Sequence, residues 1–148
     1  MPTLISFLIY AFSIIPSQGH YAVTTDPQAV TYYTLANQYY GADVLLAHEE
    51  KAGAAFMTLK AGDTIRLTYP DGLHRFIVAE IQRYTATAPL SAYSYFIDEA
   101  GNSYGSEELG RLIYTDGRLV LQTCTDGAKG RLFVIAYPAQ RHTERQGR

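Results

Sequence analysis

The sequence predicts a mostly β protein with a few short helices, on three observations. Short apolar and β-branched runs are separated by turn signals such as Pro70-Asp71-Gly72. The chain has 13 tyrosines and no tryptophan, and aromatic side chains pack well on pleated sheets. Its 148 residues, 47% of them hydrophobic and 18% charged, are enough for one core without staples. Six or seven strands joined by short turns favour a closed or nearly closed β-barrel.

Taken in order, the first regular element expected is a helix that starts at Asp26-Pro27 and runs to Tyr40. Asp is a good N-cap, Pro fits the first helical position and Gly41 is a natural stop. A helical turn is expected at 54–59, and a short helix capped by Ser106 contains Leu109, Leu112 and Ile113. Strands are expected at 43–47, 63–69, 73–84, 92–98, 119–124 and 131–137.

The N-terminal segment, residues 1–21, has two interpretations that the sequence leaves open. Leu4 to Ile15 is almost wholly apolar, and no Lys or Arg precedes Lys51. A run this short does not span a bilayer, which takes about 20 residues, but it suits a secretory signal or the remnant of an anchor. It equally suits a buried strand. Residues 22–140 form the expected domain, and residues 141–148 form a polar, basic tail.

Net charge and cysteine content exclude several classes. A formal charge of −2 argues against a nucleic-acid partner, because phosphate binding needs a basic surface. Cys124 is the only cysteine, which excludes an intramolecular disulfide and a multi-cysteine zinc cluster. It is therefore either an inert core residue or a reactive thiol.

The candidate site combines one residue from each of three predicted strand ends. Cys124 ends the apolar run that begins at Leu119, and Arg131 opens the next strand after a polar turn. If the two strands pair as a hairpin, thiol and guanidinium lie side by side, and a nearby cation favours the nucleophilic thiolate. His48 follows the apolar run 43–47 and is the candidate general acid and base. Arg131 is the candidate for stabilising an oxyanion or a substrate carbonyl.

These residues carry a resemblance to a known family. Leu121-Gln122-Thr123-Cys124, with Arg131 downstream, resembles the TLxTC signature of sortases. His48, ahead of a short loop, Phe56 and Leu59-Lys60-Ala61-Gly62-Asp63, is similar to the sortase histidine block. The resemblance covers roughly 41–138 and departs from the family at Ala47, where a glycine usually precedes the histidine. The stretch ahead of the histidine is also shorter than such enzymes usually have.

The resemblance implies a sortase-type closed eight-stranded β-barrel and a cysteine transpeptidase. Cys124 would attack a backbone carbonyl in an LPxTG-like sorting signal and form a thioacyl-enzyme. An amine from a cell-wall precursor or a pilin lysine would then resolve it. Thr123 would support the strand end and contact substrate, in a groove built with the 85–90 loop. No cofactor or metal is implied, and the location implied is extracytoplasmic, at the membrane or surface of a bacterium, with anchoring through the N-terminus.

Other interpretations fit the same residues less well or remain open. Papain-like enzymes place Cys before His, the caspase motif is only faintly echoed, and L,D-transpeptidases place Arg much closer to Cys. His74 and His142 look solvated, and His20 has no partners around it. The alternative function is a catalytically inactive barrel that binds peptide or glycan at a surface. Glu49, Glu50 and Asp43 lack metal-ligand spacing and are expected to be solvated.

Overall fold

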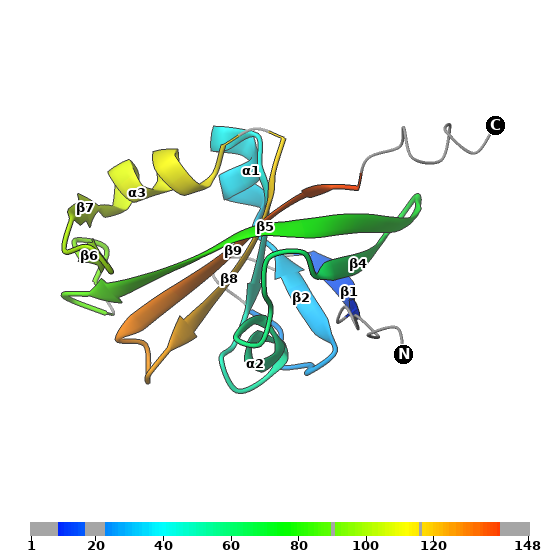
Figure 1. The fold of residues 1–148 in the computed structure, drawn as a ribbon, viewed down its shortest axis with the longest axis horizontal. Helices are drawn as coiled ribbons and strands as arrows, with labels where there is room; N and C mark the ends of the chain where they lie inside the picture. The colour runs from blue at the N-terminus through cyan, green and yellow to red at the C-terminus, as the bar shows by residue number, and fades with distance from the viewer. Residues whose placement is uncertain (1–8, 17–22, 90, 116, 140–148) are drawn as a thin grey trace, which may run out of the picture.

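The computed structural model describes residues 9–16, 23–89, 91–115 and 117–139 (Figure 1). Within these residues nine strands form one sheet in the order β4-β1-β2-β3-β8-β9-β5-β6-β7, and β4 pairs with β5 as well. The strands are β1 (Ile9–Pro16), β2 (Ala29–Tyr32), β3 (Asp43–Ala47), β4 (Thr64–Tyr69), β5 (Gly72–Ala86), β6 (Tyr95–Asp98), β7 (Ser103–Gly105), β8 (Leu119–Thr125) and β9 (Gly130–Pro138). The helices are α1 (Thr34–Tyr40), α2 (Ala52–Phe56) and α3 (Ser106–Ile113).

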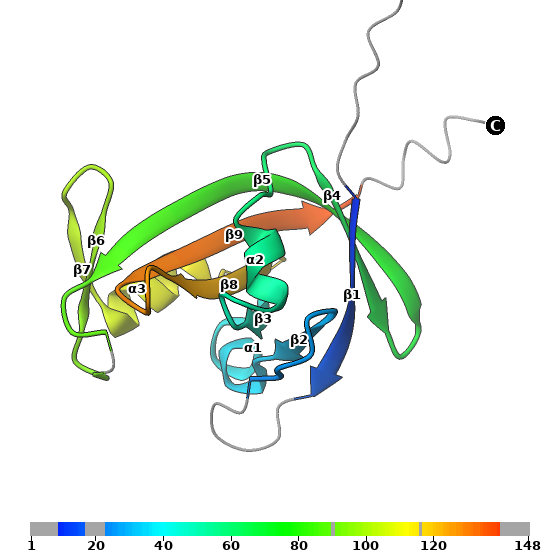
Figure 2. The ribbon, with the colours of Figure 1, turned by 90° about the horizontal axis from the view of Figure 1, so that it is seen from below.

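The long strand β5 organises the sheet. It pairs with β4 along its first half, with β9 along most of its length, and with β6 at its far end. In Figure 2, β5 and β9 run side by side across the molecule, and the β6–β7 hairpin extends from one end of β5. The mostly β fold with short helices is thus confirmed, with nine strands in place of eight. Closure into an eight-stranded barrel stays a prediction.

The central strands are buried on both faces, which explains their continuous apolar runs. One face contributes Leu45, Leu121 and Val134 to the main core beneath α2. The other contributes Val120 and Phe133 to a second cluster beneath α1 and α3. Figure 1 shows α1 and α3 on one side of the sheet and α2 on the other. Side-chain alternation along each central strand therefore sends successive residues into two different layers.

The expected helix from Asp26-Pro27 to Tyr40 is wrong in its first half, where the structure has β2. The Asp26 carboxylate accepts a 2.9 Å hydrogen bond from Gln28 N–H, and the Asp26 carbonyl accepts one of 3.2 Å from Ala29 N–H, so this stretch is a turn. Val30 and the two residues after it are β-branched or aromatic, and they pair with β1 and β3. The helical end is confirmed, because Gly41 closes α1 at a φ of 78°.

Part of the apolar N-terminal segment lies in the sheet. Residues 9–16 form β1, which runs parallel to both β2 and β4. Residues 1–8 and 17–21, and the predicted tail at 141–148, lie outside the described residues. No helix in the described ranges is long and apolar enough to cross a membrane. The signal or anchor interpretation therefore stays a prediction.

The remaining elements follow the expectations closely. The strand 43–47 and the two hairpins, β4–β5 and β8–β9, are confirmed. The expected strand 92–98 is shorter, because residues 92–94 belong to a turn before β6. Three further features differ: α2 begins two residues earlier than expected, β7 was not expected, and the N-cap of α3 is Gly105 in place of Ser106.

A carboxylate at the start of β3 ties three elements together. Asp43 accepts hydrogen bonds of 3.0 Å from both the Tyr32 and the Tyr69 hydroxyl groups, and one of 3.3 Å from Asn37 Nδ2. Burial, followed by the nearby Asp43 charge, raises the pKa of Tyr32 to about 12 and raises that of Tyr69 further. Both tyrosines therefore need to be protonated for this cluster to hold.

The fold should lose stability at alkaline pH through these hydroxyls. Because folding raises the pKa of Tyr32 from 10.0 to about 12, its stabilising contribution is full below pH 10 and is lost as the pH rises toward 12. We expect urea unfolding to show this loss in the wild type and a smaller one in Tyr32→Phe. Tyr93→Phe, at an 89% exposed position, is the control and should follow the wild type. Equal alkaline losses in all three proteins would contradict the prediction.

Candidate active site

The three candidate residues lie at one end of three adjacent strands. β3 runs parallel to β8, and its last pair is Ala47 with Thr123, so His48 follows directly beside the position of Cys124. β8 is antiparallel to β9, and Cys124 pairs with Arg131. Paired residues in a sheet point to the same face, so the side chains of Cys124 and Arg131 share one face. This register makes the three predicted strands neighbours, and the roles of His48, Cys124 and Arg131 stay predictions.

His48 and Cys124 are both accessible from solvent. Cys124 is half-buried, and the His48 side chain is exposed. His48 Nε2 lies 3.2 Å from the Val23 carbonyl oxygen. Because a carbonyl only accepts, this hydrogen bond requires the proton on Nε2 and leaves Nδ1 of the neutral ring as the basic nitrogen.

Arg131 is already engaged by backbone carbonyls. Nη1 donates to the oxygens of Ala128 at 2.6 Å and Gly130 at 3.0 Å, and Nη2 donates to the oxygen of Pro89 at 2.8 Å. Its guanidinium carbon lies 5.7 Å from the centre of the Phe96 ring. Within the described part of the chain, Nε–H and the second Nη2 hydrogen have no acceptor. Arg131 thus fastens the β8–β9 turn to the β5–β6 loop and retains two donors.

Thr123 lies on the opposite face of β8 from Cys124. Its side chain is only 2% exposed, and Oγ1 is buried without a hydrogen-bond partner among the described residues. Of the two roles expected for Thr123, support of the strand end from the core side agrees with this burial, with β propensity and with packing against α2. The expected contact with substrate stays a prediction, and the burial of the side chain does not favour it.

Gly53 is a site-forming residue that the sequence analysis missed. The His48 carbonyl accepts hydrogen bonds from Lys51 N–H at 3.0 Å and Gly53 N–H at 2.9 Å, which fixes α2 against the strand ends. A Cβ on Gly53 would lie 2.5 Å from that carbonyl oxygen and closer still to Thr123 Oγ1. The available signal was a glycine five residues after the histidine, which marks a close backbone approach.

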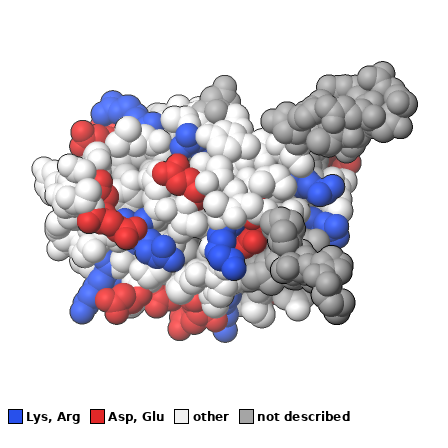
Figure 3. All heavy atoms as spheres, in the orientation of Figure 1, with Lys and Arg blue, Asp and Glu red and all other residues white. Residues whose placement is uncertain are grey.

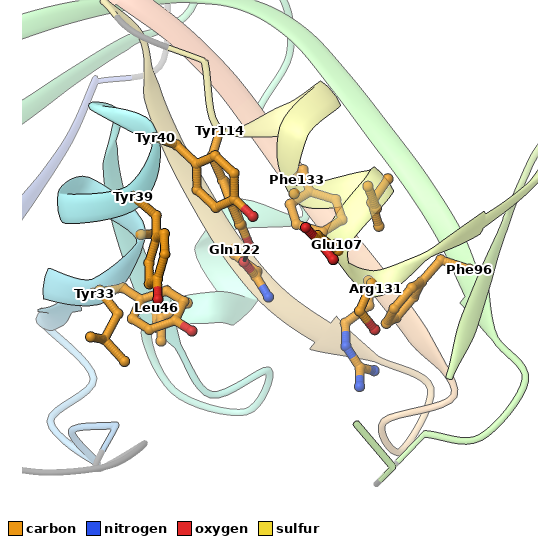
Figure 4. A pocket seen from close by; sticks show the side chains of 15 residues that line it. Tyr33, Tyr39, Tyr40, Leu46, Phe96, Glu107, Tyr114, Gln122, Arg131 and Phe133 are labelled. Carbon is orange, nitrogen blue, oxygen red and sulfur yellow. Dashed lines mark hydrogen bonds between the residues drawn. The ribbon is translucent and has the colours of Figure 1, made fainter. Parts of the chain in front are cut away.

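A groove of about 470 Å³ opens on one face of the sheet, and of the three candidate residues only Arg131 lines it (Figure 4). Its floor includes Gln122, two residues before Cys124 and therefore on the same face. Six of its fifteen lining residues are aromatic, and they come from α1 and its N-cap, the C-cap of α3, β6 and β9: Tyr33, Tyr39, Tyr40, Phe96, Tyr114 and Phe133. Figure 4 places Arg131 at one end of these side chains.

The walls of this groove differ from the expected ones. The loop 85–90 was expected to line it beside the strands of Cys124 and Arg131. Here α1 and α3 form the walls instead, and Pro89 of the loop binds Arg131 through its carbonyl. The loop does line a separate hollow of about 610 Å³, in which Ala88 and Pro89 face the β8–β9 turn, so its expected part in the substrate groove stays a prediction. Leu90 lies outside the described residues. On the groove floor, the Tyr114 hydroxyl donates to Gln122 Oε1, and burial raises the pKa of Tyr114, which keeps that donor protonated at neutral pH.

Charges on the surface are mixed. On the face drawn in Figure 3, acidic and basic side chains are interspersed and neither sign forms an extended patch. This distribution agrees with the net charge of −2. Among the described residues, no three His, Cys, Asp or Glu side chains come close enough together to hold a metal ion.

Solved structures resemble this architecture. The chain superposes on sortase A of Listeria monocytogenes with a TM-score of 0.53, at 18% identity, over 86% of this chain and 77% of that one. It superposes on sortase C1 of Streptococcus agalactiae with a TM-score of 0.52, at 14% identity, over 86% and 60%. The chain has a sortase-like fold. No sortase class follows from this likeness, which at these identities shows the fold alone.

Other comparisons limit the conclusions that can be drawn from this structural similarity. No protein-family model and no curated protein sequence matches the chain. In the complex of S. agalactiae sortase C1 with MTSET, the match covers 67% of this chain but 45% of that one. The chain thus spans between about half and three quarters of the sortases named here. Residue roles in this sortase-like chain must therefore rest on its own geometry.

The contact between α2 and the strand ends can be tested at Gly53. Gly53→Ala should destabilise the protein by about 1–3 kcal/mol, because the added methyl group overpacks a buried contact. Gly105→Ala is the control, since the nearest atom to its added Cβ lies 4.0 Å away. Urea unfolding of both variants is the measurement. A Gly53 variant as stable as the Gly105 variant would show that α2 is not seated as described.

Proposed function

We propose that the protein is a sortase-like cysteine transpeptidase. The observation that supports this most directly is the β3–β8–β9 register, in which Cys124 pairs with Arg131 and Thr123 pairs with Ala47, the residue before His48. Acyl transfer through a thioester needs a nucleophile, a general acid and base, and donors for the oxyanion, and a thiol, an imidazole and a guanidinium can fill these three roles. The sortase-like fold and the TLxTC-like signature agree with the same function.

In the proposed reaction Cys124 gives its thiol proton to Nδ1 of His48, and the resulting thiolate attacks a backbone carbonyl carbon of the substrate. The C–S bond forms, and negative charge develops on the carbonyl oxygen. The unoccupied Arg131 donors are the candidates to stabilise it, together with backbone N–H groups. His48 then gives a proton to the departing amine as the C–N bond breaks, leaving a thioacyl-enzyme.

The second half of the reaction reverses these roles. An incoming amine loses a proton to His48 and attacks the thioester carbon, and the Cys124 thiolate leaves. With Nε2 held by the Val23 carbonyl, Nδ1 is the nitrogen that accepts and returns the proton. Water in place of the amine would give hydrolysis.

The aromatic groove is the proposed site for the substrate residues that precede the attacked bond. Its floor shares a face with Cys124, so an extended peptide can lie along it and present a carbonyl at the strand end. Apolar residues of an LPxTG-like signal suit the aromatic lining. We propose a surface protein as the substrate, a cell-wall or pilin amine as the acceptor, and the bacterial cell surface as the location.

Substitution of Cys124 should abolish thioacyl formation. When wild-type protein is incubated with an LPxTG-like peptide, mass spectrometry should find a covalent acyl adduct on Cys124, and Cys124→Ala should show neither adduct nor cleavage. His48→Ala should lower the cleavage rate about 10²–10⁴-fold, the usual contribution of general acid–base catalysis. His74→Ala is the matched control, because that ring contacts Asp71 in the β4–β5 hairpin. Cleavage by the alanine variant of Cys124 would overturn the mechanism.

A catalytically inactive binding module is the alternative, and one observation favours it. Arg131 donates to three backbone carbonyls and His48 to a fourth, so both side chains have structural partners without substrate. On this alternative the groove binds a peptide or glycan, and Cys124 has no chemical role.

Thiol alkylation separates the two functions without a known substrate. A catalytic Cys124 should react with iodoacetamide well below pH 8, because the thiolate is the reactive species. The His48→Ala variant should react more slowly there, since the imidazolium that supports the thiolate is gone. The rate between pH 5 and 9, followed by mass spectrometry, is the measurement. A wild-type rate that rises only above pH 8, unchanged in the variant, would favour the binding module.

A further inference from the structure

Glu49 links the two strand ends that carry the candidate catalytic pair. It follows His48 in the chain, and its Oε1 accepts a 3.2 Å hydrogen bond from Gly127 N–H, 78 positions away in sequence. Gly127 belongs to the β8–β9 turn, which begins directly after Cys124 and Thr125. The Glu49 side chain therefore connects the chain directly after His48 to the turn that follows Cys124.

The turn that Glu49 contacts has an unfavourable backbone. Asp126, Gly127 and Ala128 all adopt left-handed conformations, with φ values of 50°, 63° and 76°. Two of these residues carry a Cβ, and such residues rarely adopt positive φ unless the surroundings hold them there. Two side chains provide that support: Glu49 binds Gly127 N–H, and Arg131 binds the Ala128 carbonyl at 2.6 Å.

The second carboxylate oxygen of Glu49 indicates that this contact is not a source of net stability. Oε2 is buried and has no hydrogen-bond partner within the described residues. A buried carboxylate oxygen without a donor is costly. The neighbouring Glu50, by contrast, is exposed. The position of Glu49 is therefore better explained by the geometry that it imposes than by the energy that it adds.

We propose that Glu49 is a positioning residue that fixes the separation of His48 and Cys124. It does so by anchoring the strained β8–β9 turn to the start of the loop after β3. Its effect on catalysis rests on the proposed transpeptidase function, whereas its effect on the turn does not. Loss of the anchor should let the turn relax and move Cys124 relative to His48, and small displacements of reacting groups cost large factors in rate.

The test compares Glu49→Ala, Glu49→Gln and the control Glu50→Ala. Glutamine keeps an acceptor oxygen for Gly127 N–H, whereas alanine removes it. Hydrogen–deuterium exchange of a peptide covering 125–130 reports on the turn, and cleavage kinetics with an LPxTG-like peptide report on alignment. We expect Glu49→Ala to speed exchange and to lower kcat at least about tenfold with KM within about twofold, because the groove is untouched. Glu49→Gln and Glu50→Ala should stay close to the wild type.

The outcomes separate this inference from the proposed function. Exchange and kcat in Glu49→Ala that match Glu50→Ala would overturn it. Equal losses in Glu49→Gln and Glu49→Ala would also overturn it, because charge rather than the hydrogen bond would then be responsible. Wild-type protein that forms no acyl adduct would overturn the transpeptidase function. In that case the exchange data and the rate of Cys124 alkylation, compared across the three variants, decide the role of Glu49.

Discussion

The parallel pairing of β3 with β8 is the constraint on which the candidate site depends. Register in a sheet is fixed where both faces are buried, because a slip of one residue sends every side chain to the wrong layer. Here Val44 beside Val120 packs under α1 and α3, while Leu45 beside Leu121 packs in the main core. The same register sets the position of His48 beside Cys124 at the strand ends. Packing of the core therefore fixes how these two residues lie relative to each other.

The strand ends need further support, because hydrogen bonding within the sheet stops there. On the core side, α2 rests against them through Gly53, which has room only for a hydrogen atom. On the turn side, Arg131 binds carbonyls of the β8–β9 turn and of the β5–β6 loop. These contacts restrict the motion of the backbone at the strand ends. An active site requires such fixed geometry more than it requires added stability.

Local patterns in the sequence predicted the parts of the fold that depend on neighbours in the chain. The strand–turn–strand around Cys124 and Arg131 has apolar runs and turn residues at hairpin spacing, and it was predicted correctly. The prediction of a helix over 26–40 was wrong in its first half, because Asp26-Pro27 suits a turn as well as a helix N-terminus. Pairing with β1 and β3 favours a strand after that turn. The groove walls were missed because α1 and α3 meet across it from distant parts of the chain.

Alternation along β8 separates structure from chemistry within one strand. Leu119 and Leu121 face the main core, whereas Val120 and Gln122 face the helices and the groove. By alternation, Thr123 lies on the first side and Cys124 on the second. Thr123 and Cys124 are adjacent in the family-like signature, yet the period of two assigns them opposite surroundings. The role of Thr123 therefore follows from its packing in the core. The role of Cys124 depends on which other groups lie on its face of the sheet. The two adjacent residues of the signature therefore have different surroundings, because successive residues of a strand point to opposite faces of the sheet.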